Sequence, residues 1–465
     1  MTKTIAQELA ARINGLKFDD YPQEAIDWAK VAVLDTLGVS LAGAPEETTQ
    51  IPIKVLGSGQ TPGQNTGPSL IWGSAMRTTP MDAALINGTA AHALDYDDCH
   101  DNMGGHPSAA IIPSVLALGD DITLTGRDFI EAFIAGYEME TRLAMGVHYT
   151  HYLKGWHPTA TMGLFGAAAA CGRLLKFDDD IMATVLALCC SMAAGVKANF
   201  GTMTKPLHVG LLNRNGLFAA LMAKEGFTAS MEAFEHKQGF FMVYNGEGTY
   251  DTEKVLDNWA QPLQILEPGV AIKQFPSCGG THSAADAVIK LKNDHNLVAN
   301  DIEKIESKTH EWRFKHTNRP NPRSDLDAKF SVQYVMARAM VDGVLKLEHF
   351  ENDNYADPEV LSLLKRIESV AHNDDDDRYS AYITITTKDG RKLEGYFSRA
   401  RGRGPSVALS ADELKTKFVN CASRGVPSEK VEALYAACQT LESLNDLRDL
   451  TNLMETKSAN VQAAE

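Results

Sequence analysis

The sequence changes its pattern of apolar residues near residue 269, which divides the chain into regions of different fold class. Before it, the chain consists mostly of segments rich in Ala, Leu, Gly and Met, whose apolar residues recur with the period of an α-helix. Several of these segments are apolar on almost all sides, as expected for helices in the middle of a large helical domain. The predicted helices span residues 81–98, 107–119, 127–147, 158–175, 179–195 and 206–225.

After residue 269 the pattern becomes mixed. β-Branched alternation at 301–314 and 380–397 predicts strands, and Asp389-Gly390 predicts a hairpin turn within the second segment. Helices are expected between these strands, at about 280–294, 328–343 and 358–368.

From about residue 409 the helical pattern returns, so the last segment is expected to pack on the first domain. A chain of 465 residues is long enough for more than one domain. We therefore predict a mainly α fold with two domains. Residues 1–268 with 409–465 form a large all-helical domain, and 269–408 form a smaller α+β domain.

The charge balance excludes some classes of partner. Lys and Arg number 44 against 60 Asp and Glu, which gives a formal net charge of -16 and disfavours binding to nucleic acid or anionic membranes. The seven cysteines show no CxxC spacing, which indicates reduced thiols. The N-terminal segment lacks an apolar signal core, and the apolar stretch at 181–196 is shorter than a membrane span. These features predict a cytoplasmic protein.

Residues 92–109, HALDYDDCHDNMGGHPSA, are the densest group of chemically active side chains. Imidazole, carboxylate and thiolate groups are the usual metal ligands, and this stretch could supply them from His92, Asp95, Asp98, Cys99, His100 and His106. However, His92 and Asp95 are expected on one helix, and a Gly104-Gly105 turn is expected to direct His106 away toward the next helix. No HxxxH or CxxC spacing occurs here. We therefore predict no metal at this stretch.

Basic residues stand before several predicted helix starts. His106 opens HPSA, His157 opens HPTA, Lys205 precedes a proline, and Lys273 leads into a turn that reaches a helix at about residue 280. Helix N-termini expose unpaired N–H groups and the positive end of the helix dipole, and therefore favour anions. If these helix ends converge, this acidic protein acquires a strongly cationic pocket for a small substrate with two or three carboxylates.

Four motifs carry a resemblance to a known family. In chain order they are HALDYDDCHDNMGGHPSAAIIPSVLALGD, GWHPTATMGLFGAAAACGRLL, TKPLHVGLLNRNGLFAALMA and IKQFPSCGGTHSAADAV. Together they resemble the MmgE/PrpD family, which includes 2-methylcitrate dehydratase, cis-aconitate decarboxylase and iminodisuccinate epimerase. The resemblance covers essentially the whole chain. It implies a homodimer whose smaller domain acts as a lid, and an active site between the domains that uses no metal or organic cofactor.

The resemblance also implies roles for individual residues. The family pattern falls on His106, His157 and Lys205 as catalytic residues. The residues expected to bind substrate are Asp95, Lys273, Cys278, His282 and His316. Two positions depart from the decarboxylases, because Cys278 stands where they have a further His and His316 falls near their lid-domain Tyr. These departures favour dehydration or epimerisation over decarboxylation.

The chemistry of the family is compatible with these residue types. Removal of a proton next to a carboxylate creates a dianion-like species, which forms at useful rates only when cations and N–H dipoles already face it. Dehydration then needs an acid for the leaving hydroxyl, whereas epimerisation needs a second base on the opposite face. We predict a 2-methylcitrate dehydratase-like lyase, with a dicarboxylate epimerase and a decarboxylase as alternatives. A metal-dependent hydro-lyase and a non-catalytic carboxylate-binding protein are the alternatives from other classes.

Overall fold

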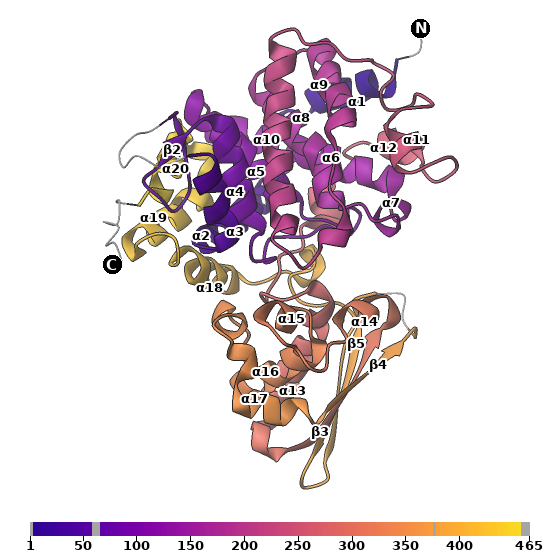
Figure 1. Cartoon of the computed structure of the whole chain (residues 1–465), viewed down its shortest axis with the longest axis vertical. Helices are drawn as coiled ribbons and strands as arrows, with labels where there is room; N and C mark the ends of the chain where they lie inside the picture. Colours follow the sequence, from indigo (N-terminus) through magenta and orange to yellow (C-terminus); the bar gives the residue numbers. More distant parts are fainter. Residues whose placement is uncertain (1–2, 58–65, 375–377, 457–465) are drawn as a thin grey trace. The chain divides into compact units, whose positions relative to one another are not determined.

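The computed structural model describes residues 3–57, 66–374 and 378–456 and divides into two compact units (Figure 1). Unit 1 comprises Met1–Ile272 and Ser410–Glu465, and unit 2 comprises Lys273–Leu409. The predicted mainly α fold is confirmed. Within the described ranges, no helix combines the length and the apolar character needed to cross a membrane.

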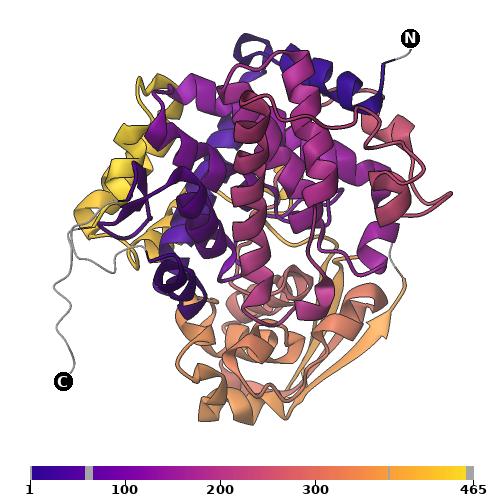
Figure 2. The ribbon, with the colours of Figure 1, turned by 45° about the horizontal axis from the view of Figure 1, so that its top comes forward.

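Unit 1 is built from helices contributed by both ends of the chain. Its longer helices are α1 (Ile5–Gly15), α2 (Gln23–Gly43), α3 (Glu47–Val55), α4 (Pro80–His92), α5 (Pro107–Asp121), α6 (Gly126–Val147), α8 (Pro158–Leu174), α9 (Asp179–Met192), α10 (Thr204–Lys224), α18 (Ala411–Ala422) and α19 (Ser428–Gln439). Its short elements are α7 (Thr150–Leu153), α11 (Phe240–Tyr244), α12 (Thr252–Leu256), α20 (Arg448–Thr451), β1 (Ser69–Leu70) and β2 (Arg77–Thr78). The C-terminal helices α18 and α19 pack against α2, and Figure 2 shows them in yellow beside the indigo and purple N-terminal helices.

The predicted helix at 81–98 is wrong at its C-terminal end. Helix α4 begins after the Thr79 cap, whose side chain accepts from the Asp82 N–H, and it ends at His92. Asp95 then adopts a φ of 53°, a left-handed conformation that stops a helix. The residues between His92 and α5 therefore form a loop, which is free to fold back on itself.

Close packing of α4 against α10 brings two parts of the candidate site together. At Gly88 an added Cβ would lie 3.0 Å from the Val209 carbonyl oxygen, and at Gly210 it would overlap the Leu85 carbonyl oxygen. Only glycine permits backbones to approach this closely. The contact positions His92 at the end of α4 and Lys205 near the start of α10.

Replacing Gly210 with alanine is therefore expected to lower the free energy of unfolding by about 1–3 kcal/mol, the usual cost of overpacking. Gly15→Ala is the control, because nothing lies within 4 Å of a Cβ at that position. Urea unfolding of both variants checks the prediction. Equal stability of Gly210→Ala and the wild type would contradict the packing described here.

Unit 2 combines a four-stranded sheet with helices. Its elements are α13 (His282–His295), β3 (Ile302–His310), α14 (Glu311–Thr317), α15 (Asp325–Lys329), α16 (Val332–Asp342), α17 (Pro358–Leu364), β4 (Ile367–His372), β5 (Ala381–Thr387) and β6 (Lys392–Phe397). The strand order is β4-β3-β5-β6, with β3 parallel to β4 and antiparallel to β5. Alternate residues of β5 are buried, and the core of the unit lies between the sheet and the helices α13 and α16.

The hairpin predicted at Asp389-Gly390 is confirmed, because β5 and β6 pair antiparallel and Gly390 has a φ of 88°. Two other expectations in unit 2 are wrong. The segment 301–314 divides into β3 and α14, and the helix expected at 358–368 stops at Leu364 because β4 follows. Strand β4 is held by its pairing with β3, a non-local interaction that the local pattern does not report.

Candidate active site

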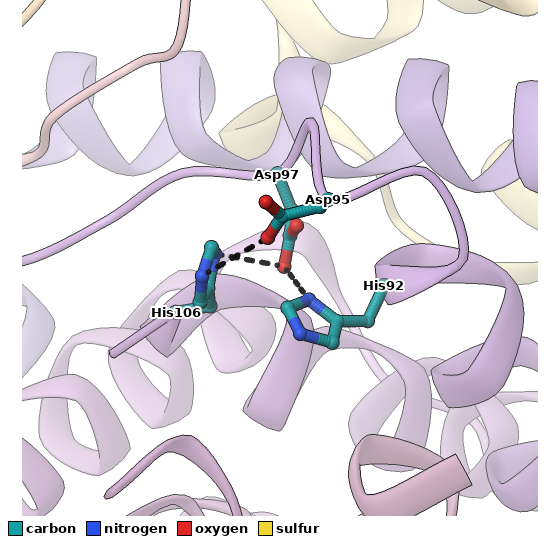
Figure 3. A group of neighbouring side chains, drawn as sticks. All are labelled: His92, Asp95, Asp97 and His106. Atoms are coloured by element: carbon teal, nitrogen blue, oxygen red, sulfur yellow. Dashed lines mark hydrogen bonds and ion pairs between the residues drawn. The ribbon is translucent and has the colours of Figure 1, made fainter. Parts of the chain in front are cut away.

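Four side chains of unit 1 meet at the loop between α4 and α5 (Figure 3). We call His92, Asp95, Asp97 and His106 the His–Asp cluster. Asp97 Oδ2 lies 2.8 Å from His92 Nδ1 and 3.3 Å from His106 Nδ1. Asp95 Oδ1 lies 3.6 Å from His106 Nε2. The cluster thus places His106 between two carboxylates.

The expectation that His106 points away from His92 is wrong. The Gly104 N–H donates to the His100 carbonyl oxygen at 2.9 Å, and the His100 N–H donates to the Gly105 carbonyl oxygen at 3.0 Å. These bonds turn the loop back, so that the imidazole rings of His92 and His106 lie 4.5 Å apart. A second pair of backbone hydrogen bonds, between Cys99 and Ala271, holds the same loop within unit 1.

The three predicted catalytic residues gather here from three helix starts. His106 precedes α5 and His157 precedes α8 as N-cap residues, while Lys205 is the second residue of α10. Lys205 Nζ lies 2.7 Å from Asp95 Oδ1. The ring of His157 lies 5.8 Å from that of His92. These helix starts therefore converge within one unit.

Positive and negative charges balance among the side chains that meet within unit 1. The cations Lys205 and His106 stand beside the carboxylates of Asp95 and Asp97, so the two pairs balance. The helix starts supply the two cations. The loop after α4 supplies the carboxylates that neutralise them, Asp95 for Lys205 and Asp97 for His106. A polyanionic substrate would need additional positive charge, for which Lys273 remains the predicted source.

The pKa values of the histidines diverge. Burial opposes the charge on His106, but Asp97 and the Cys99 thiol outweigh it and raise the pKa of His106 to about 10. Burial lowers the pKa of His92 to about 4, although Asp97 opposes the shift. Burial and then Lys205 hold the pKa of His157 well below its usual range. At neutral pH the site therefore contains a cationic His106 beside neutral imidazoles.

The pKa of Asp97 lies well below its ordinary value. Burial would raise it, but His106 and His92 reverse the shift. Asp97 is therefore a carboxylate although it is fully buried.

Two side chains that contact the predicted catalytic histidines were not among the predicted site residues. Asp97 reaches His106 only through the fold of the loop, for which the local sequence carries no signal. His208 lies on α10 with its Nδ1 3.2 Å from that of His157. Its position three residues after Lys205, on the same helix face, is a spacing that could have identified it.

The other predicted substrate-binding residues lie in unit 2. Lys273 is buried at the start of the unit, and Cys278 precedes the helical turn at Gly279–Thr281. His282 is the first residue of α13, and its Nε2 lies 3.1 Å from the Ser277 carbonyl oxygen. Burial would raise the pKa of Cys278, but a hydrogen bond from His316 outweighs it and lowers this pKa to about 7. Cys278 and His316 thus lie within hydrogen-bond distance of each other in unit 2.

The His–Asp cluster also has the composition of a metal site. Each of its four residues offers one nitrogen or oxygen ligand atom, and these four atoms lie within 4.8 Å of one another. Imidazole and carboxylate ligands suit zinc or iron. However, the Lys205 ammonium already pairs with Asp95, and Asp97 accepts from both imidazoles. A divalent ion would have to displace these partners.

We therefore expect treatment with a chelator to leave the activity unchanged, because bonds between protein groups already satisfy the cluster. Turnover before and after dialysis against EDTA, with the metal content measured in parallel, checks this prediction. Stoichiometric zinc or iron, with activity lost on chelation and restored by the metal, would contradict it.

Comparison with known proteins identifies relatives along the whole chain. The MmgE/PrpD N-terminal domain matches residues 7–253, and the MmgE/PrpD C-terminal domain matches residues 275–442. The chain is 30% identical to cis-aconitate decarboxylase of Mus musculus, over 100% of this chain and 96% of the mouse protein. The human cis-aconitate decarboxylase is also 30% identical, over 98% and 96% of the two chains. Mitochondrial 2-methylcitrate dehydratase of Yarrowia lipolytica is 22% identical, over 94% and 87%. The chain therefore belongs to the MmgE/PrpD family.

Proposed function

We propose that this protein is a lyase that acts on a small di- or tricarboxylate by proton transfer, with dehydration as the first candidate reaction. The proposal rests on the different pKa values of two histidines that border one site, since the pKa of His106 is raised and that of His157 is lowered. Neighbouring groups whose pKa values are pushed apart suit the roles of acid and base. Dehydration uses both roles in a single turnover.

In this mechanism His157 removes the proton next to a substrate carboxylate. Negative charge of the bound substrate offsets the effect of Lys205 and raises the pKa of His157, which makes it a stronger base. Lys205 stabilises the dianion-like species that forms. His106 donates its Nε2 proton to the departing hydroxyl group, so that water leaves and a C=C bond forms. The N–H groups at the start of α5 and α8 favour the anionic substrate.

A second candidate is decarboxylation. The 30% identity to two cis-aconitate decarboxylases over nearly the whole chain favours it. In that reaction a carboxylate leaves as carbon dioxide and a proton is delivered to carbon, a task for which the His106 imidazolium is suited. The family pattern predicted a further His at Cys278 and a Tyr near His316, and because of these departures we place this reaction second.

A panel of citrate-type and aconitate-type acids distinguishes the candidates. Dehydration predicts new C=C absorbance from hydroxy acids without carbon dioxide, whereas decarboxylation predicts carbon dioxide release. Chiral analysis of an imino-diacid in the same panel detects the epimerase alternative. Racemisation without any alkene or carbon dioxide would overturn the lyase proposal.

A further inference from the structure

Asp97 has an unusual position for a carboxylate. It is fully buried, and its Oδ2 atom accepts hydrogen bonds from the Nδ1 atoms of both His92 and His106. Within the described residues, its second oxygen has no hydrogen-bond partner. A buried, ionised carboxylate is costly unless cations or donors compensate it. Its retention between two imidazoles therefore points to a task that a neutral side chain would not perform.

We propose that Asp97 is a positioning residue that orients His106 and holds it in the protonated form, while His92 fixes the Asp97 carboxylate. The catalytic consequence rests on the proposed function, but the orientation and protonation of His106 do not. Asp97 acts through His106 and need not touch the substrate.

The charged and titratable groups around His106 come from several elements. The Lys205 ammonium on α10 opposes a positive charge on His106. The imidazoles of His92 on α4 and His157 before α8 are neutral. The groups that favour the positive charge are Asp95, Asp97 and Cys99. Asp95 is nearer to Lys205, at 2.7 Å, than to His106, at 3.6 Å. Asp97 Oδ2 lies 3.3 Å from His106 Nδ1 and also accepts from His92 Nδ1 at 2.8 Å. Asp97 is therefore the carboxylate that stabilises the imidazolium.

His92 supports this arrangement from the end of α4. Its pKa of about 4 keeps it neutral, so the proton on Nδ1 is donated to Asp97 at 2.8 Å. Its Nε2 atom is buried and has no partner among the described residues. Because a neutral His92 offers Asp97 a hydrogen bond without a full charge, the carboxylate keeps most of its charge for His106. His106 then has Nδ1 fixed on Asp97, and its Nε2, which lies 3.6 Å from Asp95 Oδ1, is the proposed proton donor.

The test is Asp97→Asn, a variant of nearly equal size that removes the charge. Histidine nitrogen NMR of the whole protein should show the pKa of His106 near 10 in the wild type, falling by more than two units toward the ordinary value of about 6.5 in the variant. A general acid works below its pKa, so the basic limb of the pH profile of kcat/KM should move down with it. At pH 8 a His106 pKa of about 6.5 leaves about 3% of the acid form, so kcat/KM should fall about 30-fold.

Asp98→Asn is the matched control. Asp98 is also fully buried, but it accepts from the Ser108 N–H at 3.2 Å and from the Ser108 hydroxyl at 2.5 Å at the start of α5. Burial raises the pKa of Asp98 well above the ordinary value, and asparagine keeps the size of the side chain and an acceptor for the Ser108 N–H. The NMR titration of His106 should therefore be the same in Asp98→Asn as in the wild type.

Three outcomes would overturn the proposal. They are titration of His106 near 6.5 in the wild type, an unchanged His106 pKa in Asp97→Asn, and an equal shift in Asp98→Asn. The wild-type titration needs no variant, so it tests the protonation of His106 even if Asp97→Asn does not fold. Because the titration is read without substrate, the positioning role is judged separately from the proposed lyase activity, which fails only if no polycarboxylate turns over.

Discussion

Replacing His106 with glutamine is expected to lower kcat by about 10²- to 10⁴-fold, the usual contribution of a general acid or base. Glutamine keeps hydrogen-bonding capacity but cannot donate a proton from a cationic ring. The wild-type His106 pKa of about 10 means that its acid form is fully present at neutral pH and is lost only as the pH rises through that value. Steady-state kinetics from pH 6 to 10, with any acid of the panel that turns over, measures both effects.

The control for this variant is His295→Gln, which changes an exposed histidine at the end of α13. Its kinetics should equal those of the wild type. A His106→Gln enzyme with more than a tenth of wild-type kcat would show that another group delivers the proton.

Replacing Lys205 with methionine is expected to raise KM and lower kcat together. Methionine is similar in length but has no charge, and the same cation is proposed to hold the substrate and to stabilise the developing negative charge. The loss in kcat/KM should correspond to about 2–4 kcal/mol, as for removal of an oxyanion-stabilising group. The family resemblance predicts a loss of the same kind for Lys273→Met.

Lys224→Met is the matched control, because Lys224 is exposed in the last turn of the same helix, α10. It changes the same residue type without changing the cluster. Wild-type kinetics in Lys205→Met would show that the helix start of α10 does not face the substrate.

The helix starts were predictable because their signals are local. Proline directly follows His106 and His157, and it occupies the first position of α5 and α8. At that position proline costs no hydrogen bond, so the preceding residue becomes the N-cap. The His-Pro motif therefore predicts where each helix begins and which residue lies at its positive end.

The proximity of His92, Asp97 and His106 was harder to predict from the sequence. Asp95 leaves the helical conformation with a positive φ, and the loop then folds back on hydrogen bonds between His100, Gly104 and Gly105. Nothing in the local pattern distinguishes this path from the one that directs His106 away. The role of Asp97 depends on that path, and it appears only once both imidazoles are placed.

Strand β4 was missed for a related reason. Residues 358–368 have a helical pattern, but the pairing of Ile367–His372 with β3 is decided by residues about sixty positions earlier in the chain. Tertiary pairing of this kind overrides local propensity in edge strands.

Proton-deuterium exchange over a panel of di- and tricarboxylates, followed by NMR, tests the proposed proton abstraction. Proton abstraction next to a carboxylate is detected whichever product follows. We predict that the wild-type protein in D₂O exchanges that proton in at least one acid of the panel, and that His157→Gln abolishes this exchange. A folded wild-type protein that neither exchanges nor turns over any of these acids would contradict the proposed proton-transfer chemistry.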